Sequence, residues 1–256
     1  MEMLRVDNLR KEFDGIKAVD GLSFSLAKGT IASLIGPNGA GKTTAFNILV
    51  GICRPDAGSV HINGKNVTRL SPYKIAKMGI GRTFQSIRVF PQMSVLDNLM
   101  LAPHDQEGER FFSALLRPRR VRTDEEKARE KAFESLRLVG LLGKQGELAE
   151  NLSHGQRKLL ELVRALATNP DLLLLDEPTA GVFPETRKKI IDLLRELRGQ
   201  GKAILLIEHD MKTVMTVSDK VIVMAEGRKI AEGRPEEIRH NKDVIEAYLG
   251  RENATA

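Results

Sequence analysis

An octapeptide near the N-terminus, Gly36-Pro-Asn-Gly-Ala-Gly41-Lys42-Thr43, restricts the folds open to this chain most strongly. It matches the pattern G-x-x-x-x-G-K-[ST], in which glycines let backbone N–H groups surround phosphate oxygens. Thr30–Ile35 before it has the pattern of a buried strand, and Lys42–Val50 after it that of a helix. This context predicts a phosphate-binding loop, in which Lys42 pairs with the β- and γ-phosphates and the Thr43 hydroxyl ligates Mg²⁺. The alternative is a glycine turn with a structural role only.

A second motif places two carboxylates at the end of an apolar run. Leu172–Leu175 predicts a buried strand, and Asp176 and Glu177 follow it directly. In open α/β sheets, ligands bind at the C-terminal edge of the strands, which is where this acid pair would lie. Asp176 is therefore predicted to hold Mg²⁺ through its water shell, and Glu177 to orient or deprotonate an attacking water. The alternative is an acid pair that starts a helix before Pro178.

A third motif, Leu152-Ser153-His154-Gly155-Gln156, lies between the other two and precedes a leucine-rich helical pattern. Ser153 and Gln156 have the spacing of a capping box, in which each side chain bonds the other residue's backbone N–H. Taken alone, the pentapeptide therefore predicts a helix N-terminus and nothing more.

Composition narrows the partners without choosing one. The 256 residues carry 40 Lys and Arg against 34 Asp and Glu, a formal net charge of +6 that suits nucleic acid, an anionic membrane surface or a phosphate ligand. Aromatic residues are scarce, which disfavours a platform for stacked bases. No apolar run approaches the ~18 residues of a membrane span, and no secretory signal is visible at the start. With a single cysteine, Cys53, a reducing compartment, the cytoplasm, is the expectation.

The remaining chain divides into three regions by pattern. The first 35 residues read as strands, including 3–13 and 19–26. The middle, from Ser71 to about Gly140, reads as mainly helical, with a capping box at Thr123–Glu126. After Pro170, apolar strands at 171–175, 203–207 and 221–225 alternate with helices, one of which starts at Pro184, and two short helices follow from 235 to 249. This alternation predicts a mostly parallel sheet covered on both faces.

A basic cluster precedes the predicted capping box and consists of Arg110, Arg117, Arg119, Arg120 and Arg122. It is expected to be a solvated loop, with contact to phospholipid head groups as the alternative.

In combination, the three motifs resemble those of the ATP-binding subunit of an ABC transporter, and they occur in that family's order over nearly the whole chain. The resemblance implies an α/β fold of the P-loop NTPase ABC cassette type, with a mainly parallel core sheet, an N-terminal antiparallel β subdomain and an inserted helical subdomain. It also implies a single ABC ATP-binding domain over residues 1–256. Within it, 1–85 and about 169–233 would form the nucleotide-binding core, about 86–168 the helical subdomain with the signature, and about 234–256 a helical tail.

The resemblance also assigns roles residue by residue. Phe13 would stack on adenine, and Gln85 would meet Mg²⁺ or water and signal to the membrane subunit. His209 would contact the γ-phosphate, and Glu177 would act on the attacking water. The expected nucleotide-binding residues are Phe13, Gly36, Pro37, Asn38, Gly39, Ala40, Gly41, Lys42, Thr43 and Thr44 of one chain, with Ser153, Gly155 and Gln156 of a second; the expected Mg²⁺ ligands are Thr43, Gln85 and Asp176. Phe13 could instead be a core aromatic, Gln85 a surface amide and His209 a polar residue at a strand end.

Two positions depart from the family's pattern. The signature usually has glycine where this chain has His154, although the Gly155 backbone and the Ser153 hydroxyl still suit a phosphate contact. Ala180-Gly-Val-Phe183 lacks the Asp that the family usually places near the end of this loop. Phe183 cannot make that polar contact across a dimer.

Three further features resemble the branched-chain amino acid importers. They are Glu208-His-Asp-Met211, the charged insertion between Asp105 and Glu130, and the ending Val244-Ile-Glu-Ala-Tyr248-Leu-Gly250. This resemblance implies two integral membrane permease subunits, a second ATP-binding subunit and an external solute-binding protein as partners. It places the chain, peripherally, at the cytoplasmic face of the inner membrane, with ATP and Mg²⁺ bound and without nucleic acid. Ile87, Val89, Phe90 and Val95 are a candidate apolar socket for a membrane-subunit helix.

Other functions remain open at this point. Urea or amide importers and lipopolysaccharide exporters share much of the pattern. A non-transport ABC ATPase acting on DNA or ribosomes is a rival, although such proteins tend to carry two cassettes or a long coiled coil. A third reading is a regulatory module that holds ATP without hydrolysing it, and Phe183 is its best support.

Overall fold

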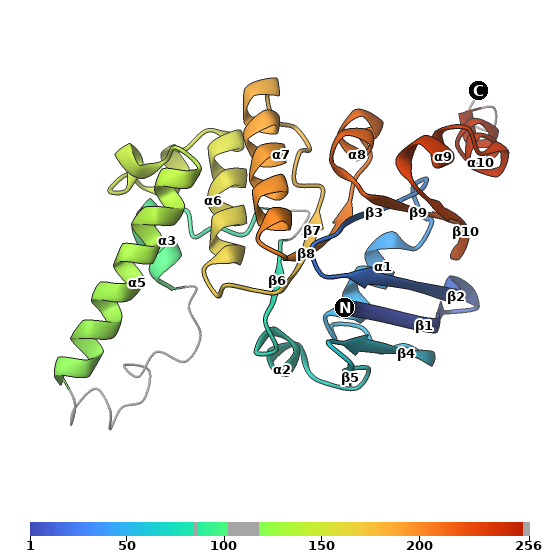
Figure 1. Cartoon of the computed structure of the whole chain (residues 1–256), viewed down its shortest axis with the longest axis horizontal. Helices are drawn as coiled ribbons and strands as arrows, with labels where there is room; N and C mark the ends of the chain where they lie inside the picture. Colours follow the sequence, from blue (N-terminus) through green and yellow to red (C-terminus); the bar gives the residue numbers. More distant parts are fainter. Residues whose placement is uncertain (84–86, 102–117, 253–256) are drawn as a thin grey trace. The chain divides into compact units, whose positions relative to one another are not determined.

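A computed structural model describes residues 1–83, 87–101 and 118–252 (Figure 1). The chain divides into two compact units, of which one comprises 1–82, 171–180 and 191–256 and the other 83–170 and 181–190. Gln85, Arg110 and Arg117 lie outside the described residues, as do the side chains of Arg119, Arg120 and Arg122. Among the described residues, no helix combines the length and the apolar character that crossing a membrane requires.

The first unit contains an antiparallel sheet. Its four strands lie in the order β2 (Ile16–Ala27), β1 (Glu2–Phe13), β4 (Ala57–Ile62) and β5 (Lys65–Asn66). Asp14 and Gly15, both at positive φ, form the tight turn between β1 and β2. Inward-facing residues of β1 and β2 alternate with exposed ones, as expected for a sheet with one buried face.

The second sheet of this unit is mostly parallel. Its strands lie in the order β10 (Arg228–Gly233), β9 (Lys220–Ala225), β3 (Ile31–Ile35), β8 (Ala203–Ile207), β7 (Leu172–Asp176) and β6 (Ile80–Arg82). All neighbours are parallel except β9 and β10. Strands β3, β7 and β8 are buried along their whole length, which explains why they read as continuous apolar runs.

Both faces of the parallel sheet pack against other elements of the unit. A large apolar core joins one face to the antiparallel sheet and to α1 (Lys42–Leu49), whose Phe46 is fully buried. On the other face, a smaller cluster joins Ile35 and Val223 to α8 (Met211–Val217), α9 (Pro235–Arg239) and α10 (Lys242–Glu252). The short helix α2 (Pro72–Ala76) precedes β6. The predicted α/β class with a mainly parallel sheet is confirmed.

The second unit is helical. It contains α3 (Val95–Met100), α5 (Pro118–Leu138), α6 (His154–Leu166) and two short 3-10 helices, Leu142–Lys144 and Ala149–Asn151. Helix α7 (Pro184–Gly199) begins in this unit and ends in the other. The buried residues of the helical unit include Leu99, Leu136 and Leu160.

One expectation for the middle region is wrong. The capping box predicted at Thr123–Glu126 does not start a helix, because α5 already begins at Pro118, a residue whose fixed φ suits the first helical turn. The region also contains a strand, β6, which pairs with β7. Three residues are too few for a period to show in the sequence, so only the parallel partner reveals this strand.

Candidate functional site

Three glycines give the segment between β3 and α1 its shape. Gly36, Gly39 and Gly41 have φ values of 147°, 77° and 96°, which side chains disfavour. A Cβ at Gly36 would lie 2.0 Å from the Met224 carbonyl oxygen, and one at Gly41 would lie 2.0 Å from that of Ala18. The chain therefore needs glycine at both positions, for two independent reasons.

Lys42 closes this loop from inside. The side chain is buried, and its Nζ donates to the carbonyl oxygens of Gly36 at 2.7 Å and Pro37 at 3.0 Å. Among the described residues, no side chain caps α1 at Gly41, and the N-terminus of a helix attracts an anion. The loop thus places a helix N-terminus beside a cation, which is what a phosphate group requires.

The predicted acid pair ends β7. Asp176 is its last residue and is only 3% exposed, whereas Glu177 follows with a positive φ of 49°. The Glu177 N–H donates to the Ile207 carbonyl at 2.9 Å, which fixes this turn against the end of β8. Glu177 Oε1 lies 2.7 Å from His209 Nε2. Two residues that the sequence placed in separate motifs are therefore direct partners.

The loop, the acid pair and His209 lie at one edge of the sheet. Strand β8 is the parallel neighbour of both β3 and β7, and Ile207 pairs with Leu34 on one side and Asp176 on the other. The residues that follow these three strands therefore meet at their C-terminal ends, where open α/β sheets bind ligands.

A buried carboxylate that the sequence reasoning treated only as part of a family pattern supports this edge. Glu208 is 2% exposed, and its Oε1 accepts from Thr179 twice, from the backbone N–H at 3.1 Å and from Oγ1 at 2.7 Å. These bonds fix the segment after Glu177 to the end of β8. The sequence held one sign of this role: Glu208 directly follows five apolar strand residues. A carboxylate in that position is expected to be buried, and a buried charge needs hydrogen-bond partners.

Thr179→Val should lower the free energy of unfolding by about 1–3 kcal/mol, because the buried Glu208 carboxylate loses its hydroxyl donor. Urea denaturation measures this loss. Thr216→Val is the matched control, since the Thr216 hydroxyl is exposed and bonds only the Lys212 carbonyl, and it should change stability by less than about 0.5 kcal/mol. Equal losses in the two variants would contradict the structural role of the Thr179–Glu208 contact.

Phe13 lies at the end of β1 and is 46% exposed, so it is not the core aromatic that the sequence left open. Lys11 Nζ lies 5.0 Å from the centre of its ring. Because this cation lies over one face of the ring, a planar ligand would stack on the other face.

The signature pentapeptide starts α6 in the helical unit. Gln156 N donates to Ser153 Oγ at 3.3 Å, and Ser153 N donates to Gln156 Oε1 at 3.0 Å, so the predicted capping box is present. A Cβ at Gly155 would lie 3.1 Å from Thr186 Oγ1, which explains glycine there. His154, in the position where the family usually has glycine, is exposed beside Gly181.

The remaining predicted positions differ in exposure, and one lies outside the described residues. Phe183 is 82% exposed, and Val95 of the proposed apolar socket is fully buried and cannot form a surface. Pro37 is partly exposed and Asn38, Gly39 and Thr43 are exposed, whereas Ala40 is buried. The structure describes nothing at Gln85.

The donor set fits Mg²⁺, which prefers hydroxyl and carboxylate oxygens and keeps most of its waters. Thr43 offers a hydroxyl and Asp176 a carboxylate. Within the described residues no group of three or more His, Cys, Asp or Glu could hold a metal ion.

Comparison with known proteins accounts for both the fold and the motifs. A family model described as ABC transporter matches residues 19–180, and one described as branched-chain amino acid ATP-binding cassette transporter matches 228–254. The chain is 44% identical over 249 residues to the high-affinity branched-chain amino acid transport ATP-binding protein LivG of Salmonella typhimurium, covering 97% of this chain and 98% of that protein.

Solved structures of ATP-binding cassettes have a similar fold. An ATP-binding cassette of an ABC transporter in its ADP conformation is 37% identical, with a TM-score of 0.83 over 98% of this chain and 99% of that one. A dimeric cassette in a post-hydrolysis state bound to ADP and Pi is 26% identical, with a TM-score of 0.76 over 91% and 99%. With a nucleotide-type phosphate loop and a family model that covers more than half of its length, this chain belongs to the ATP-binding proteins of the ABC transporter family.

Proposed function

We propose that this chain is the ATP-hydrolysing subunit of an importer for branched-chain, hydrophobic amino acids. The observation that carries the proposal is the Glu177–His209 pair, 2.7 Å apart, at the sheet edge that also bears the phosphate loop. The solute class rests on the names of the relatives and on the match of residues 228–254. Urea or amide import and lipopolysaccharide export remain the alternatives.

The residues divide the chemistry between them. The N–H groups of Gly36–Gly41 and the Lys42 ammonium bind the phosphates, and Phe13 meets the adenine. Thr43, Asp176 and Gln85 would hold Mg²⁺, which would supply positive charge against the phosphates. Glu177 accepts the proton of the attacking water as general base. His209 holds the Glu177 carboxylate before nucleotide binds, and its Nε2 then turns to the γ-phosphate and frees that carboxylate for the water.

A second cassette completes the site in this proposal. Ser153, Gly155 and Gln156 of one chain would cover the ATP held by residues 36–44 of the other, so the γ-phosphate bridges two surfaces. Hydrolysis removes that bridge, and the dimer population shifts to the open state. The proposed division is a nucleotide-binding core, 1–85 and about 169–233, a helical subdomain, about 86–168, and a tail from about 234. The two compact units support the separation of core and helical subdomain, although 181–190 groups with the helical unit and the tail with the core.

The partners follow from the same proposal. Two integral membrane permease subunits would receive the motion, and an external solute-binding protein would deliver the amino acid. The chain would act peripherally at the cytoplasmic face of the inner membrane.

Phosphate release tests the enzymatic part. The chain with ATP and Mg²⁺ should release phosphate, and Lys42→Ala should abolish release because both the charge and the loop contacts of Lys42 are lost. Uptake of labelled leucine should require the permease subunits and the binding protein as well. Release that is unchanged in Lys42→Ala would refute the site. Stimulation by duplex DNA with a steep salt dependence would favour the non-transport rival.

Ser153 allows a test that separates its structural and functional roles. Ser153→Ala removes the cap of α6 and should lower the free energy of unfolding by about 1 kcal/mol. Ser153→Asp keeps a good cap and should stay within about 0.5 kcal/mol of wild type, but its charge would repel a phosphate. Thermal unfolding and ATP turnover measure the two effects. Full turnover in Ser153→Asp would leave Ser153 as an N-cap only.

A further inference from the structure

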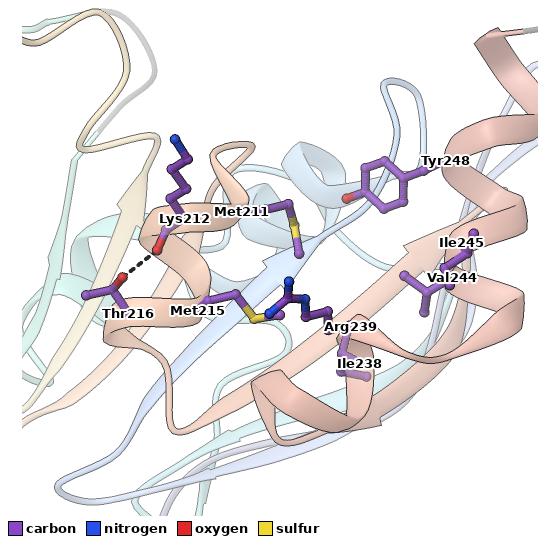
Figure 2. A pocket seen from close by; sticks show the side chains of 9 residues that line it. All are labelled: Met211, Lys212, Met215, Thr216, Ile238, Arg239, Val244, Ile245 and Tyr248. Atoms are coloured by element: carbon purple, nitrogen blue, oxygen red, sulfur yellow. Dashed lines mark hydrogen bonds between the residues drawn. The ribbon is translucent and has the colours of Figure 1, made fainter.

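A pocket separate from the phosphate loop lies between α8 and the pair α9 and α10 (Figure 2). Its volume is about 840 Å³, in the upper part of the range of small-molecule sites, roughly 300–1,000 Å³. The lining side chains are Met211, Lys212, Met215, Thr216, Ile238, Arg239, Val244, Ile245 and Tyr248. All of them belong to the unit that carries the phosphate loop.

The charged side chains that line the pocket are all cationic. Five of the nine residues are aliphatic or methionine, the two ionic ones are Lys212 and Arg239, and no carboxylate is among them. In Figure 2 the Arg239 guanidinium points toward Met215 and Met211, whereas the Lys212 side chain extends away from them. The Tyr248 hydroxyl points into the same space from α10. Arg239 is an exposed residue, so its cation lies beside the apolar wall and open to solvent. An apolar wall flanked by one cation and one hydroxyl suits a ligand with an apolar body and an anionic end.

We propose that this pocket binds a fatty acid anion of about the length of dodecanoate, with the carboxylate on Arg239 and the chain along Met211, Met215 and Val244. Arginine presents parallel N–H groups that match a carboxylate, and burial of each methylene of the chain against the methionines and Val244 favours binding. A free amino acid fits less well, because its ammonium would be left without an acid. A short branched acid would leave most of the volume unfilled.

The pocket is connected to the phosphate loop through α10. The Gly36 backbone lies close enough to the Tyr248 phenol to act on it through a hydrogen bond, which partly offsets the rise in the Tyr248 pKa caused by burial. Ile35, directly before Gly36, packs in one cluster with Val214 of α8, Ile238 of α9 and Val244 of α10. Tyr248 also packs against this cluster, so a ligand beside the phenol contacts the same apolar group that supports the residue before Gly36.

The pocket is connected to His209 through α8. Asp210 caps this helix by accepting from Lys212 N at 3.0 Å and from Thr213 Oγ1 at 3.1 Å, and His209 is the residue before it. An occupant that shifts α8 thus shifts the residue that holds Glu177. We infer that occupancy weakens ATP binding, a step that rests on the proposed function, whereas fatty acid binding itself does not.

Calorimetric titration of the nucleotide-free full-length chain with dodecanoate, below its micelle concentration, tests the site. We expect one ligand per chain, with affinity lowered roughly 10- to 100-fold by Arg239→Gln, which loses a charge-assisted pair. Met215→Glu introduces a repelling carboxylate and should weaken binding at least as much. Lys212→Gln, at the cation that extends away, is the matched control and should stay within about twofold.

Three outcomes would overturn the site. They are equal affinity in wild type and Arg239→Gln, equal losses in Arg239→Gln and Lys212→Gln, and tighter binding of leucine or 4-methyl-2-oxopentanoate than of dodecanoate. The first two would mean nonspecific adsorption, and the third a small-acid site.

The proposed coupling between the pocket and the phosphate loop is tested separately, by ATP affinity. Saturating dodecanoate should raise the dissociation constant for ATP by roughly 5- to 50-fold, and ATP should weaken dodecanoate binding by the same factor. Tyr248→Phe keeps the ring in the pocket but removes the phenolic oxygen, so it should bring this factor close to one. An unchanged or inverted factor in wild type would refute the coupling. A chain that binds dodecanoate but not ATP would refute the proposed function and leave the pocket standing.

Discussion

Glu177→Gln should reduce the rate of ATP hydrolysis by roughly 10²- to 10⁴-fold, because glutamine cannot accept the proton of the attacking water. ATP affinity should stay close to that of wild type, since the amide oxygen can still accept from His209 Nε2 and the phosphate loop is untouched. Phosphate release at saturating ATP and Mg²⁺ measures the first effect, and equilibrium titration with nucleotide measures the second. With hydrolysis blocked, ATP should also hold two chains together as a stable dimer, which size-exclusion chromatography detects.

Glu226→Gln controls for the substitution itself. Glu226 is exposed in the turn between β9 and β10 and shares the positive φ of Glu177, 49° at both residues. Any effect of placing glutamine in this backbone conformation is therefore common to both variants, and only the Glu177 variant should lose turnover. Wild-type turnover in Glu177→Gln would remove Glu177 from the role of general base. Loss of ATP binding together with turnover would instead make it a structural residue of the loop.

The parallel sheet could be predicted because burial on both faces leaves an unbroken apolar run. Leu172–Leu175 and Ala203–Ile207 appear in the sequence almost as they appear in the structure. Strand β6 and the start of α5 could not be predicted in the same way. Strand β6 is too short to show a period, and Pro118 starts a helix well before the more conspicuous polar residues at Thr123–Glu126.

Local motifs predicted the conformation of the site better than its contacts. Glycines at positions 36, 39 and 41 indicated a phosphate-binding loop, and in the structure all three have positive φ. Ser153 and Gln156 predicted a capping box, which is present. Contacts between residues far apart in the chain have no comparable sequence pattern that would predict them. The sequence assigned Glu177 and His209 separate roles, and only the register of β7 and β8 brings their side chains together. The link between Tyr248 and Gly36 likewise depends on how α10 packs over the end of β3.

Gly41→Ala should strongly destabilise the protein. A Cβ at this position would lie 2.0 Å from the Ala18 carbonyl oxygen and 3.2 Å from its carbon, and backbone atoms of a paired strand cannot move aside cheaply. The clash adds to the cost of a left-handed φ of 96°, so we expect a loss of about 3–5 kcal/mol in the free energy of unfolding. That is a large share of the roughly 5–15 kcal/mol that holds a domain folded, and urea denaturation would measure it.

Gly39→Ala separates the two causes. Gly39 has a comparable φ of 77°, but a Cβ there would meet nothing within 4 Å. The control variant therefore bears the backbone strain alone and should lose only about 1–2 kcal/mol. The difference between the two variants is the contribution of the close approach between the loop and β2, the contact that fixes where α1 begins. Equal losses would mean that the glycines serve backbone conformation only, and that the loop owes nothing to its packing against Ala18.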